Sequence, residues 1–511
     1  MSTWCGDCFK ELLPDGTCAK GHPQPQPANP QPVADLQAGT AVQAAPPRRR
    51  GAHARPGGGD RPDPLPDEPR TELGYAKRLA HVYGDRLRYV AAWRRWLIWD
   101  GRRWAADDTG QAARWAKSIA RQVTADALAV SGDDRSLNLA RRGESSAAVK
   151  GALTLAGTET GIVVTPDQLD ADPFLLNCHN GTLDLRTGQL RAHEPADLLT
   201  KMAGAPWQPG AAGPEFARFL SRIQPDPQMR AYLARLLGHA LEGRQVEHVM
   251  GILFGAGANG KGTLIGAVDR ALGDYSDAAD PELLTARTFD AHPTGVADLF
   301  GLRLAILHES DRGRRLAEGT IKRLTGGDRI KARRMREDFW SFDPSHTFVM
   351  LTNHKPLVSG TDEGIWRRLR LVPFDVVVPP AERDEELPDR LALELEAVLA
   401  WLIDGYADWH RLGLADPDPV TAATDSYRAE SDALARFIEQ RCLTGPHFSV
   451  RSSDLFAAWS KWCADEGEPA GTQTAFSTQL VNRGYDKRPT NMGKVWQRIG
   501  LAADDGEPDA R

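Results

Sequence analysis

The chain has 511 residues, 41% of them hydrophobic, which suffices for about three domains with cores and excludes disorder throughout. Its formal net charge of −6 excludes a polycation, so any contact with nucleic acid must come from local basic patches. No stretch approaches the ~20 apolar residues of a membrane span, and no secretory segment opens the chain. Six cysteines are too few for a disulfide scaffold in a chain of this length. We therefore expect an intracellular protein without a membrane partner.

Residue types that bind zinc are concentrated in residues 1–22. Cys5 and Cys8 form a Cys-x2-Cys turn, and Cys18 and His22 supply a second pair. Because four such ligands satisfy a tetrahedral zinc ion, the spacing predicts a small zinc knuckle that is unfolded without its metal. The alternative is a set of unpaired thiols on a flexible tail.

A linker and a mainly helical domain are predicted next. Residues 23–70 are rich in Pro, Gln, Ala, Gly and Arg, which predicts a linker without a core; its arginines either touch nucleic acid or only solubilise a tether. Helical patterns dominate residues 110–155 of the N-terminal domain predicted over 71–212. Four tryptophans (93, 96, 99 and 104) surround a hairpin turn at Asp100-Gly101; they either stack on bases or, as we prefer, form the core of a small sheet.

A glycine-rich loop marks the core predicted over residues 213–380. An apolar run at 249–254 predicts a buried parallel strand, and residues 264–272 have helical spacing up to Gly273. Strand, glycine loop and helix together are typical of a phosphate-binding loop. The loop comprises Gly255, Ala256, Gly257, Ala258, Asn259, Gly260, Lys261, Gly262 and Thr263.

Each part of this loop has a role in binding a nucleoside triphosphate. The glycines let backbone N–H groups face the phosphates, the following helix adds its dipole, and Lys261 reaches the β- and γ-phosphates. The usual pattern has Ser or Thr directly after the lysine, whereas here Gly262 intervenes and Thr263 carries the hydroxyl expected to bind magnesium. A glycine-rich turn that binds nothing is the alternative, which the strand, helix and lysine disfavour.

Acidic residues end a second apolar run at residues 302–311. Ligands of open α/β sheets bind beyond the carboxyl ends of the strands, so an acid there can hold magnesium or polarise the attacking water. We expect Glu309 to take this role, with Asp311 as the second choice. Surface acids at a strand exit are the alternative.

Residues 311–340 reverse the overall charge, with ten Lys and Arg against five Asp and Glu, a local excess of +5. The Gly-Gly pair at 326–327 and the aromatic pair at 339–340 predict strands joined by a turn. Such a basic hairpin suits a phosphodiester backbone. Its expected DNA contacts are Lys331, Arg333 and Arg334. A solvated basic face is the alternative.

Two further strand ends complete the predicted site. A strand over 347–352 ends at Asn353, whose amide can sense the γ-phosphate or orient water if this strand lies between the acidic strand and the phosphate loop. Arg367 and Arg368 precede another strand, and a guanidinium suits a phosphoryl group in transfer. If subunits form a ring, either arginine could reach a neighbour's ATP; an intramolecular ion pair is an equally balanced alternative.

Five motifs occur in one order between residues 249 and 375: Gly-Ala-Asn-Gly-Lys-Gly-Thr, Leu-His-Glu-Ser-Asp, Leu-Thr-Gly-Gly-Asp-Arg-Ile-Lys-Ala-Arg, Thr-Asn-His-Lys-Pro and Ile-Trp-Arg-Arg. They resemble the superfamily 3 helicases, most closely the phage and plasmid primase-helicase branch that includes the poxvirus primase-helicase. The resemblance implies an AAA+-like α/β P-loop ATPase core, a hexameric ring, ATP hydrolysis at subunit interfaces and translocation on single-stranded DNA.

The resemblance also assigns roles to matching positions. It makes Lys261 and Thr263 phosphate-loop residues, Glu309 the acidic-strand residue, Asn353 the sensor, Lys331 and Arg333 hairpin contacts, and Arg367 or Arg368 the arginine finger. Many relatives carry an N-terminal primase domain, for which the segment before residue 70 is too short. A separate primase is therefore the expected partner.

A helical connector over 381–424 and a last domain over 425–501 are predicted after the core. The connector's apolar positions, expected to form its buried side, are Leu391, Leu393, Leu395, Val398, Leu399 and Leu402. Three helical patterns and a basic two-stranded ribbon have the plan of a winged helix, with a helical protein-docking domain as the alternative. The expected contacts with duplex phosphates are Lys487, Arg488, Lys494 and Arg498. Residues 502–511 are acidic and are expected to form a disordered tail.

These patterns favour a Mg²⁺- and ATP-dependent DNA helicase that acts on single-stranded and forked DNA as a homo-oligomer, during replication of a phage, plasmid or integrated element in the host cytoplasm. Two other classes stay open. An ATP-gated origin-binding or loading factor would remodel DNA without unwinding it. A small-molecule phosphotransferase also uses Gly-Lys-Gly-Thr, but needs neither a basic hairpin nor a terminal basic domain.

Overall fold

The computed structural model describes eight stretches of the chain. These are residues 67–130, 134–286, 293–308, 314–334, 339–358, 362–468, 470–490 and 493–502. The predicted zinc ligands Cys5, Cys8, Cys18 and His22, nearly all of the predicted linker, the acids Glu309 and Asp311, and most of the predicted tail lie outside the described residues.

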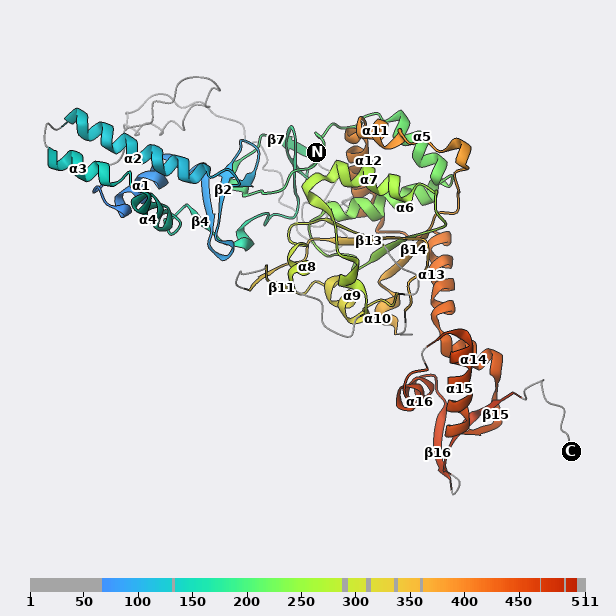
Figure 1. Cartoon of the computed structure of the whole chain (residues 1–511). Coiled ribbons are helices and arrows are strands. Elements are labelled where there is room, and N and C mark those ends of the chain that lie inside the picture. Colours follow the sequence, from blue (N-terminus) through green and yellow to red (C-terminus); the bar gives the residue numbers. More distant parts are fainter. Residues whose placement is uncertain are drawn as a thin grey trace, which may run out of the picture.

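Four helices form the N-terminal bundle, as the helical spacing predicts. They are α1 (Glu72–Tyr83), α2 (Gln111–Val130), α3 (Asp134–Arg142) and α4 (Ser146–Ala156). The Thr71 hydroxyl caps α1 by accepting a hydrogen bond from the Gly74 N–H. Apolar faces of α1, α2 and α4, including Leu79, Ile119 and Ala152, share one core. In Figure 1 this bundle stands at one end of the molecule, beside the main domain.

A four-stranded sheet in the order β3-β2-β1-β4 connects the bundle to the main domain. Its strands are β1 (Leu87–Val90), β2 (Arg95–Trp99), β3 (Trp104–Ala106) and β4 (Val163–Val164). The predicted Asp100-Gly101 turn is confirmed, because Trp99 pairs with Trp104 across it. Trp104 is 1% exposed and serves as core, whereas Trp93 packs edge-on against Phe300 and Trp340 of the main domain.

A small antiparallel sheet, β5-β6-β7, follows the bundle. Its strands are β5 (Leu175–Cys178), β6 (Gly181–Asp184) and β7 (Gln189–Arg191). Cys178 is buried among apolar side chains, and burial raises the pKa of its thiol to about 12. A thiol in that state is inert, which agrees with reading it as structural.

Five parallel strands in the order β14-β8-β13-β10-β9 form the central sheet. They are β8 (Met250–Phe254), β9 (Ser276–Ala278), β10 (Leu304–His308), β13 (Thr347–Thr352) and β14 (Leu369–Pro373). The middle strands β8, β13 and β10 are buried almost throughout, as strands covered on both faces must be. The predicted mixed α/β class is confirmed for this part of the chain.

Helices cover both faces of the central sheet (Figure 1). One face carries α5 (Pro214–Ile223), α6 (Pro227–Gly238), α7 (Lys261–Leu272), α11 (Leu387–Ala392) and α12 (Leu395–Leu412). The other carries α8 (Pro293–Ala297), α9 (Glu318–Leu324), α10 (Glu363–Trp366) and α13 (Asp418–Ser431). Helix α6 crosses α12 closely at Gly405, where an added Cβ would lie 2.1 Å from the Ala234 carbonyl oxygen. Single-turn 3-10 helices occur at Ala91–Trp93, Pro166–Gln168, Pro195–Asp197, His239–Leu241, Gly273–Tyr275, Pro281–Leu284 and Pro380–Glu382.

The basic region differs in part from its prediction. A hairpin is present, formed by β11 (Ile330–Ala332) and β12 (Trp340–Phe342). The Gly-Gly pair at 326–327, however, is not its turn, because residues 318–324 form α9 and the glycines follow that helix. Ile321 and Leu324 are buried on one side of α9, and this burial of a few apolar residues outweighs the charge pattern.

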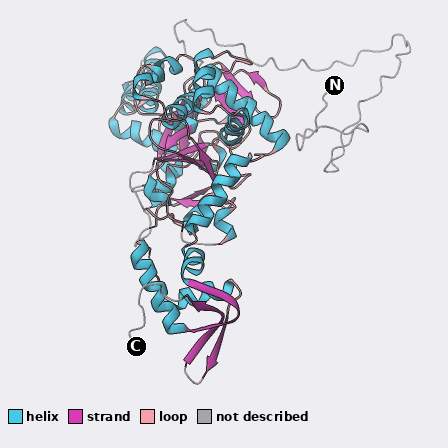
Figure 2. Cartoon of the chain, turned by 90° about the vertical axis from the view of Figure 1, so that its right-hand side faces the viewer, coloured by secondary structure: helices cyan, strands magenta, loops and turns pink. Residues whose placement is uncertain are grey.

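The C-terminal module contains three helices and a three-stranded antiparallel sheet. Its elements are α14 (Ala433–Arg441), β15 (Cys442–Arg451), α15 (Ser452–Glu466), α16 (Gln473–Asn482), β16 (Asp486–Thr490) and β17 (Gly493–Leu501). The helices and the β16–β17 ribbon match the predicted pattern, while β15, which pairs with β17, was not predicted. Figure 2 shows the module set apart below the main domain.

Two further expectations for this region need correction. The predicted domain boundary at 424/425 falls inside α13, whose Tyr427 is buried in the core of the main domain, so the module begins after Ser431. Leu393 was expected on the buried side of the connector but is 86% exposed. It lies between α11 and α12 rather than on one continuous helix, which breaks the spacing that placed it inside.

Candidate nucleotide-binding site

The predicted glycine loop connects the end of β8 to the first residue of α7. Gly260 has φ = 81°, and a Cβ there would lie 2.4 Å from Ile223 of α5, so glycine is required for both backbone and packing reasons. Ala258 also has positive φ (61°), a strained value for a residue with a side chain. Strain in a loop of this kind is typical of a binding site.

Lys261, in the first turn of α7, is only 6% exposed. Its Nζ donates to the Gly255 carbonyl at 2.7 Å, to Asn259 Oδ1 at 3.0 Å and to Asn353 Oδ1 at 3.3 Å. Burial lowers the pKa of this amine to about 8. Because these partners are neutral dipoles, the positive charge is solvated by the protein without being neutralised, and is suited to an incoming anion.

Asn259 connects the lysine to the edge of the sheet. It is 3% exposed, its Oδ1 accepts from Lys261, and its Nδ2 donates to the Phe374 carbonyl at 3.1 Å. The sequence marked Asn259 only as one member of the loop. Its contact with Phe374, just beyond β14, depends on the order of the strands in the sheet. The loop motif alone does not predict that order.

The strand order brings Asn353 to the lysine. Strand β13 lies between β8 and β10, with Thr352 opposite Phe254 and Leu351 opposite His308. The condition placed on Asn353 by the sequence analysis is therefore met. Glu309 follows His308 in the chain, so it comes directly after the end of β10, but it lies outside the described residues.

A cavity of about 320 Å³ opens beside the loop and was not predicted from the sequence. Loop and helix residues Ala258, Gly260 and Thr263 form one wall of it. The remaining walls come from α5 and from the segment after β14, with Phe219, Arg222, Ile223, Val378, Glu382, Arg383 and Leu387 among the lining residues. A concave, partly apolar space next to a phosphate loop suits the base and sugar of a nucleotide.

The two arginines after α10 differ in their surroundings. Arg368 is half-buried; its Nε donates to Thr325 Oγ1 at 3.1 Å and its Nη1 to the Gly364 carbonyl at 2.8 Å. Arg367 is exposed, and no hydrogen bond or ion pair joins its side chain to the part of the chain that the structure describes. Arg368 is thus held within its own chain by neutral partners, and the predicted intramolecular ion pair is seen for neither arginine among the described residues.

Cations of the basic hairpin gather around one exposed aromatic ring. Lys331 Nζ and the Arg333 guanidinium lie 4.7 and 4.8 Å from the centre of the Phe339 ring, which is 52% exposed. The Arg334 guanidinium lies 5.9 Å from the Trp93 ring of the N-terminal sheet. Two cations flanking an exposed ring can contact phosphates while the ring stacks on a base.

The predicted basic residues of the C-terminal module lie on its ribbon. Arg488 and Lys494 are exposed, and Arg498 donates to the Gly484 carbonyl at 2.8 Å. Lys487 is half-buried, with its Nζ 2.9 Å from Ser477 Oγ and 4.9 Å from the centre of the Trp496 ring. Three of the four are thus on the surface, and Lys487 holds the ribbon against α16.

The described residues contain no group of three or more His, Cys, Asp or Glu side chains placed to hold a metal ion. Among their helices, none is long and apolar enough to cross a membrane.

Two family models match separate parts of the chain. The family model described as "D5 N terminal like" matches residues 76–225, from the N-terminal bundle to α5. A second model, a family of unknown function (DUF5906), matches residues 253–368, from the phosphate loop to Arg368. Together with the relatives below, these matches fit a D5-like primase-helicase-family protein. The resemblance to the poxvirus-like primase-helicases is thereby confirmed.

Two similar proteins are viral. A protein of Acanthamoeba polyphaga mimivirus, provisionally named a helicase, is 28% identical over 293 residues, covering 53% of this chain and 30% of its own length. A provisionally named primase of African swine fever virus is 25% identical over 324 residues, covering 58% of this chain and 34% of its own. The chain thus spans about a third of these relatives. Among solved structures, the apo C-terminal region of NrS-1 is 11% identical with a TM-score of 0.44, covering 85% of this chain and 100% of that one.

Proposed function

We propose that this D5-like protein is an ATP-dependent DNA helicase for replication of a phage, plasmid or integrated element. The observation that carries the proposal is the hydrogen bond between Lys261 and Asn353. It joins a phosphate-loop amine to an amide on the neighbouring strand, at the edge where open α/β sheets bind ligands. An amide in this position can contact the γ-phosphate or the attacking water once the lysine turns to the phosphates.

The residues present fit a magnesium-bound nucleotide. Thr263 lies in the first turn of α7 and lines the cavity, so its hydroxyl can serve as one ligand. Glu309 follows β10 and supplies a carboxylate, with Asp311 as the second choice. When bound, the ion would neutralise charge on the phosphates. The protein's own part is to hold the phosphates at Lys261 and to orient water through Asn353.

Hydrolysis at a subunit interface would use Arg367 rather than Arg368. Arg368 is held by Thr325 and Gly364 of its own chain, whereas Arg367 is exposed. A guanidinium that supplies charge to a neighbour's nucleotide must be free of internal partners before the neighbour arrives. This assignment requires a homo-oligomer, and a hexameric ring is the form that the family resemblance implies.

The DNA-binding elements would be the β11–β12 hairpin and the C-terminal module. Lys331, Arg333 and the exposed Phe339 form a contact suited to single-stranded DNA. The module carries a basic ribbon beside its helices, which suits duplex phosphates at a fork and supports the winged-helix role expected from the sequence. A separate primase would provide priming, and a zinc knuckle at Cys5, Cys8, Cys18 and His22 remains a proposal from the sequence.

The experiment that tests this function measures ATP hydrolysis with and without single-stranded DNA. A helicase is expected to hydrolyse ATP faster when DNA is added, and Lys261→Ala is expected to abolish both rates while leaving DNA binding intact. Hydrolysis that DNA does not affect, together with phosphate transfer to a small molecule, would favour a phosphotransferase. DNA-stimulated hydrolysis without strand release would favour a loading factor.

A further inference from the structure

Helix α13 (Asp418–Ser431) joins the main domain to the C-terminal module and contacts two elements of the candidate site. In Figure 1 it runs along the edge of the main domain and ends at the module. Its Tyr427 is 2% exposed and belongs to the core of the main domain. The helix is therefore packed against the main domain close to its C-terminal end, and that same end leads into a DNA-binding candidate.

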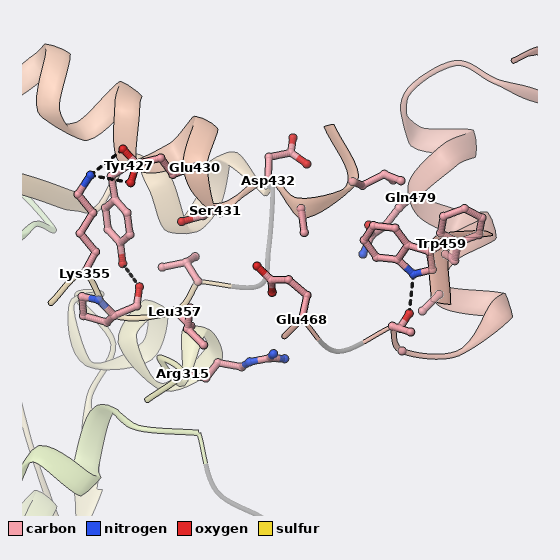
Figure 3. A pocket seen from close by; sticks show the side chains of 18 residues that line it. Arg315, Lys355, Leu357, Tyr427, Glu430, Ser431, Asp432, Trp459, Glu468 and Gln479 are labelled. Carbon is pink, nitrogen blue, oxygen red and sulfur yellow. Dashed lines mark hydrogen bonds and ion pairs between the residues drawn. The ribbon is translucent and has the colours of Figure 1, made fainter. Parts of the chain in front are cut away.

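The first contact is with the turn that follows Asn353. Lys355 Nζ lies 2.8 and 2.7 Å from the two carboxylate oxygens of Glu430, and the Tyr427 hydroxyl donates to the Pro356 carbonyl. Figure 3 shows both contacts side by side on α13. Because Lys355 is two residues from Asn353, a shift of the sensor amide would move a group that α13 holds.

The second contact is with α10, the helix directly before Arg367. Arg428 Nη2 lies 2.7 Å from Glu363 Oε2, and the Trp366 and Tyr427 rings meet edge-on at 5.1 Å. One helix thus contacts the turn that follows the proposed sensor Asn353 and the short helix that precedes Arg367.

The C-terminal end of α13, which carries Tyr427, Arg428 and Glu430, leads directly into the module. Asp432 follows α13, caps α14 by accepting from the Ala435 N–H at 2.9 Å, and pairs with Arg483. Beside it, a cavity of about 390 Å³ separates the two bodies, with Arg315 and Leu357 on the core side and Trp459 and Gln479 on the module side (Figure 3). This space leaves room for the module to move when α13 shifts.

We propose that α13 couples the nucleotide state of the ATP site to the grip of the C-terminal module on duplex DNA. Glu430 and Arg428 are positioning residues in this coupling, acting through Lys355 and Glu363. This coupling rests on the proposed ATP site. It adds a link between that site and duplex binding by the C-terminal module. Both ion pairs are substantially exposed, so they add little to folding stability, and their loss should change coupling rather than folding.

The test measures binding of the full chain to a fluorescein-labelled forked duplex by anisotropy, at one salt concentration, with and without a non-hydrolysable ATP analogue. The variants are Glu430→Gln and Arg428→Gln. Asp425→Asn is the matched control, since it removes one negative charge from an exposed position of the same helix. The exchange Lys355→Glu with Glu430→Lys tests rescue. Binding of the analogue is measured separately by calorimetry.

The analogue is expected to change the duplex Kd of the wild type by about fivefold or more. Glu430→Gln and Arg428→Gln should bring that ratio close to one, Asp425→Asn should preserve it, and the exchanged pair should restore it. A wild-type ratio of one despite analogue binding, or an unchanged ratio in Glu430→Gln, would overturn the coupling and leave the ATP site standing. Absence of analogue binding in the wild type would instead overturn the proposed function, and the coupling with it.

Discussion

Asn353 Oδ1 lies 3.3 Å from Lys261 Nζ, although 92 residues separate them in the chain. The two groups come from adjacent elements of the sheet, one following β13 and the other following β8 and its loop. Because the amine is nearly inaccessible to water and its partners are uncharged, a bound triphosphate would have to replace these partners. In the proposed ATP site, this contact would break when nucleotide binds, which would release the Asn353 amide.

The first prediction concerns pH. The pKa of Lys261 is lowered to about 8, so the folded protein without nucleotide loses this proton well before an ordinary lysine does. Below pH 8 the amine is charged and binds phosphate; above it, affinity for an ATP analogue should fall by up to about tenfold per pH unit. Titration calorimetry between pH 7 and 9.5 checks this. A flat profile would show that the amine does not contact the phosphates.

The lowered pKa of Lys261 also predicts how the stability of the protein without nucleotide changes with pH. Because its pKa is lower in the folded state than in the unfolded state, the unfolded chain binds more protons between pH 8 and 10.5. The contribution of Lys261 therefore makes the protein without nucleotide more stable as pH rises through this window. In Lys261→Met that part of the pH dependence should be missing from urea titrations.

The second prediction separates the two arginines. Arg367→Ala should lower kcat by about 10³-fold or more without changing the melting temperature, as for other arginine fingers. Arg368→Ala should instead lower stability by about 1 kcal/mol for the bonds to Thr325 and Gly364. Steady-state ATPase assays and thermal melts of both variants check this. Equal kcat losses with equal destabilisation would contradict the assignment.

The third prediction concerns the hairpin. Lys331→Ala combined with Arg333→Ala should abolish stimulation of ATP hydrolysis by single-stranded DNA while leaving basal hydrolysis unchanged, since neither cation lines the cavity beside the phosphate loop. Arg329→Ala is the control, because that guanidinium already contacts Ser341 and Asp343 of its own hairpin. If stimulation persists in the double variant, the hairpin is a solvated basic face.

The fourth prediction concerns packing. Gly405→Ala should destabilise the main domain by about 1–3 kcal/mol, because the new methyl group would meet the Ala234 backbone. Gly266→Ala, on the exposed side of α7 with nothing within 4 Å of an added Cβ, should stabilise it by about 0.5–1 kcal/mol. Thermal melts compare the two. Equal shifts of the same sign would exclude the close helix crossing as the cause.

The sequence predicted local features well where one pattern determined one structure. The strand, loop and helix around Lys261 are as expected, with the helix ending at Leu272 before Gly273. Residues 318–324 were misread because charge masked the few apolar residues that α9 buries. Leu393 was misplaced because a break between two helices leaves no mark in hydrophobic spacing.

Other features depended on strand order and could not be read from the chain alone. The link from Lys261 through Asn259 to Phe374, and the cavity lined by Phe219 and Arg383, bring together segments more than a hundred residues apart. The difference between Arg367 and Arg368 depends on whether a partner such as Thr325 lies within reach. Adjacent residues of one type carry no sequence signal that separates them.

The most direct measurement is strand release from a forked duplex, followed together with ATP consumption by the same preparation. The wild type is expected to release the strand only while it consumes ATP, and Lys261→Ala is expected to bind the fork but do neither. Strand release by Lys261→Ala, or ATP consumption by the wild type that never separates the strands, would contradict this expectation.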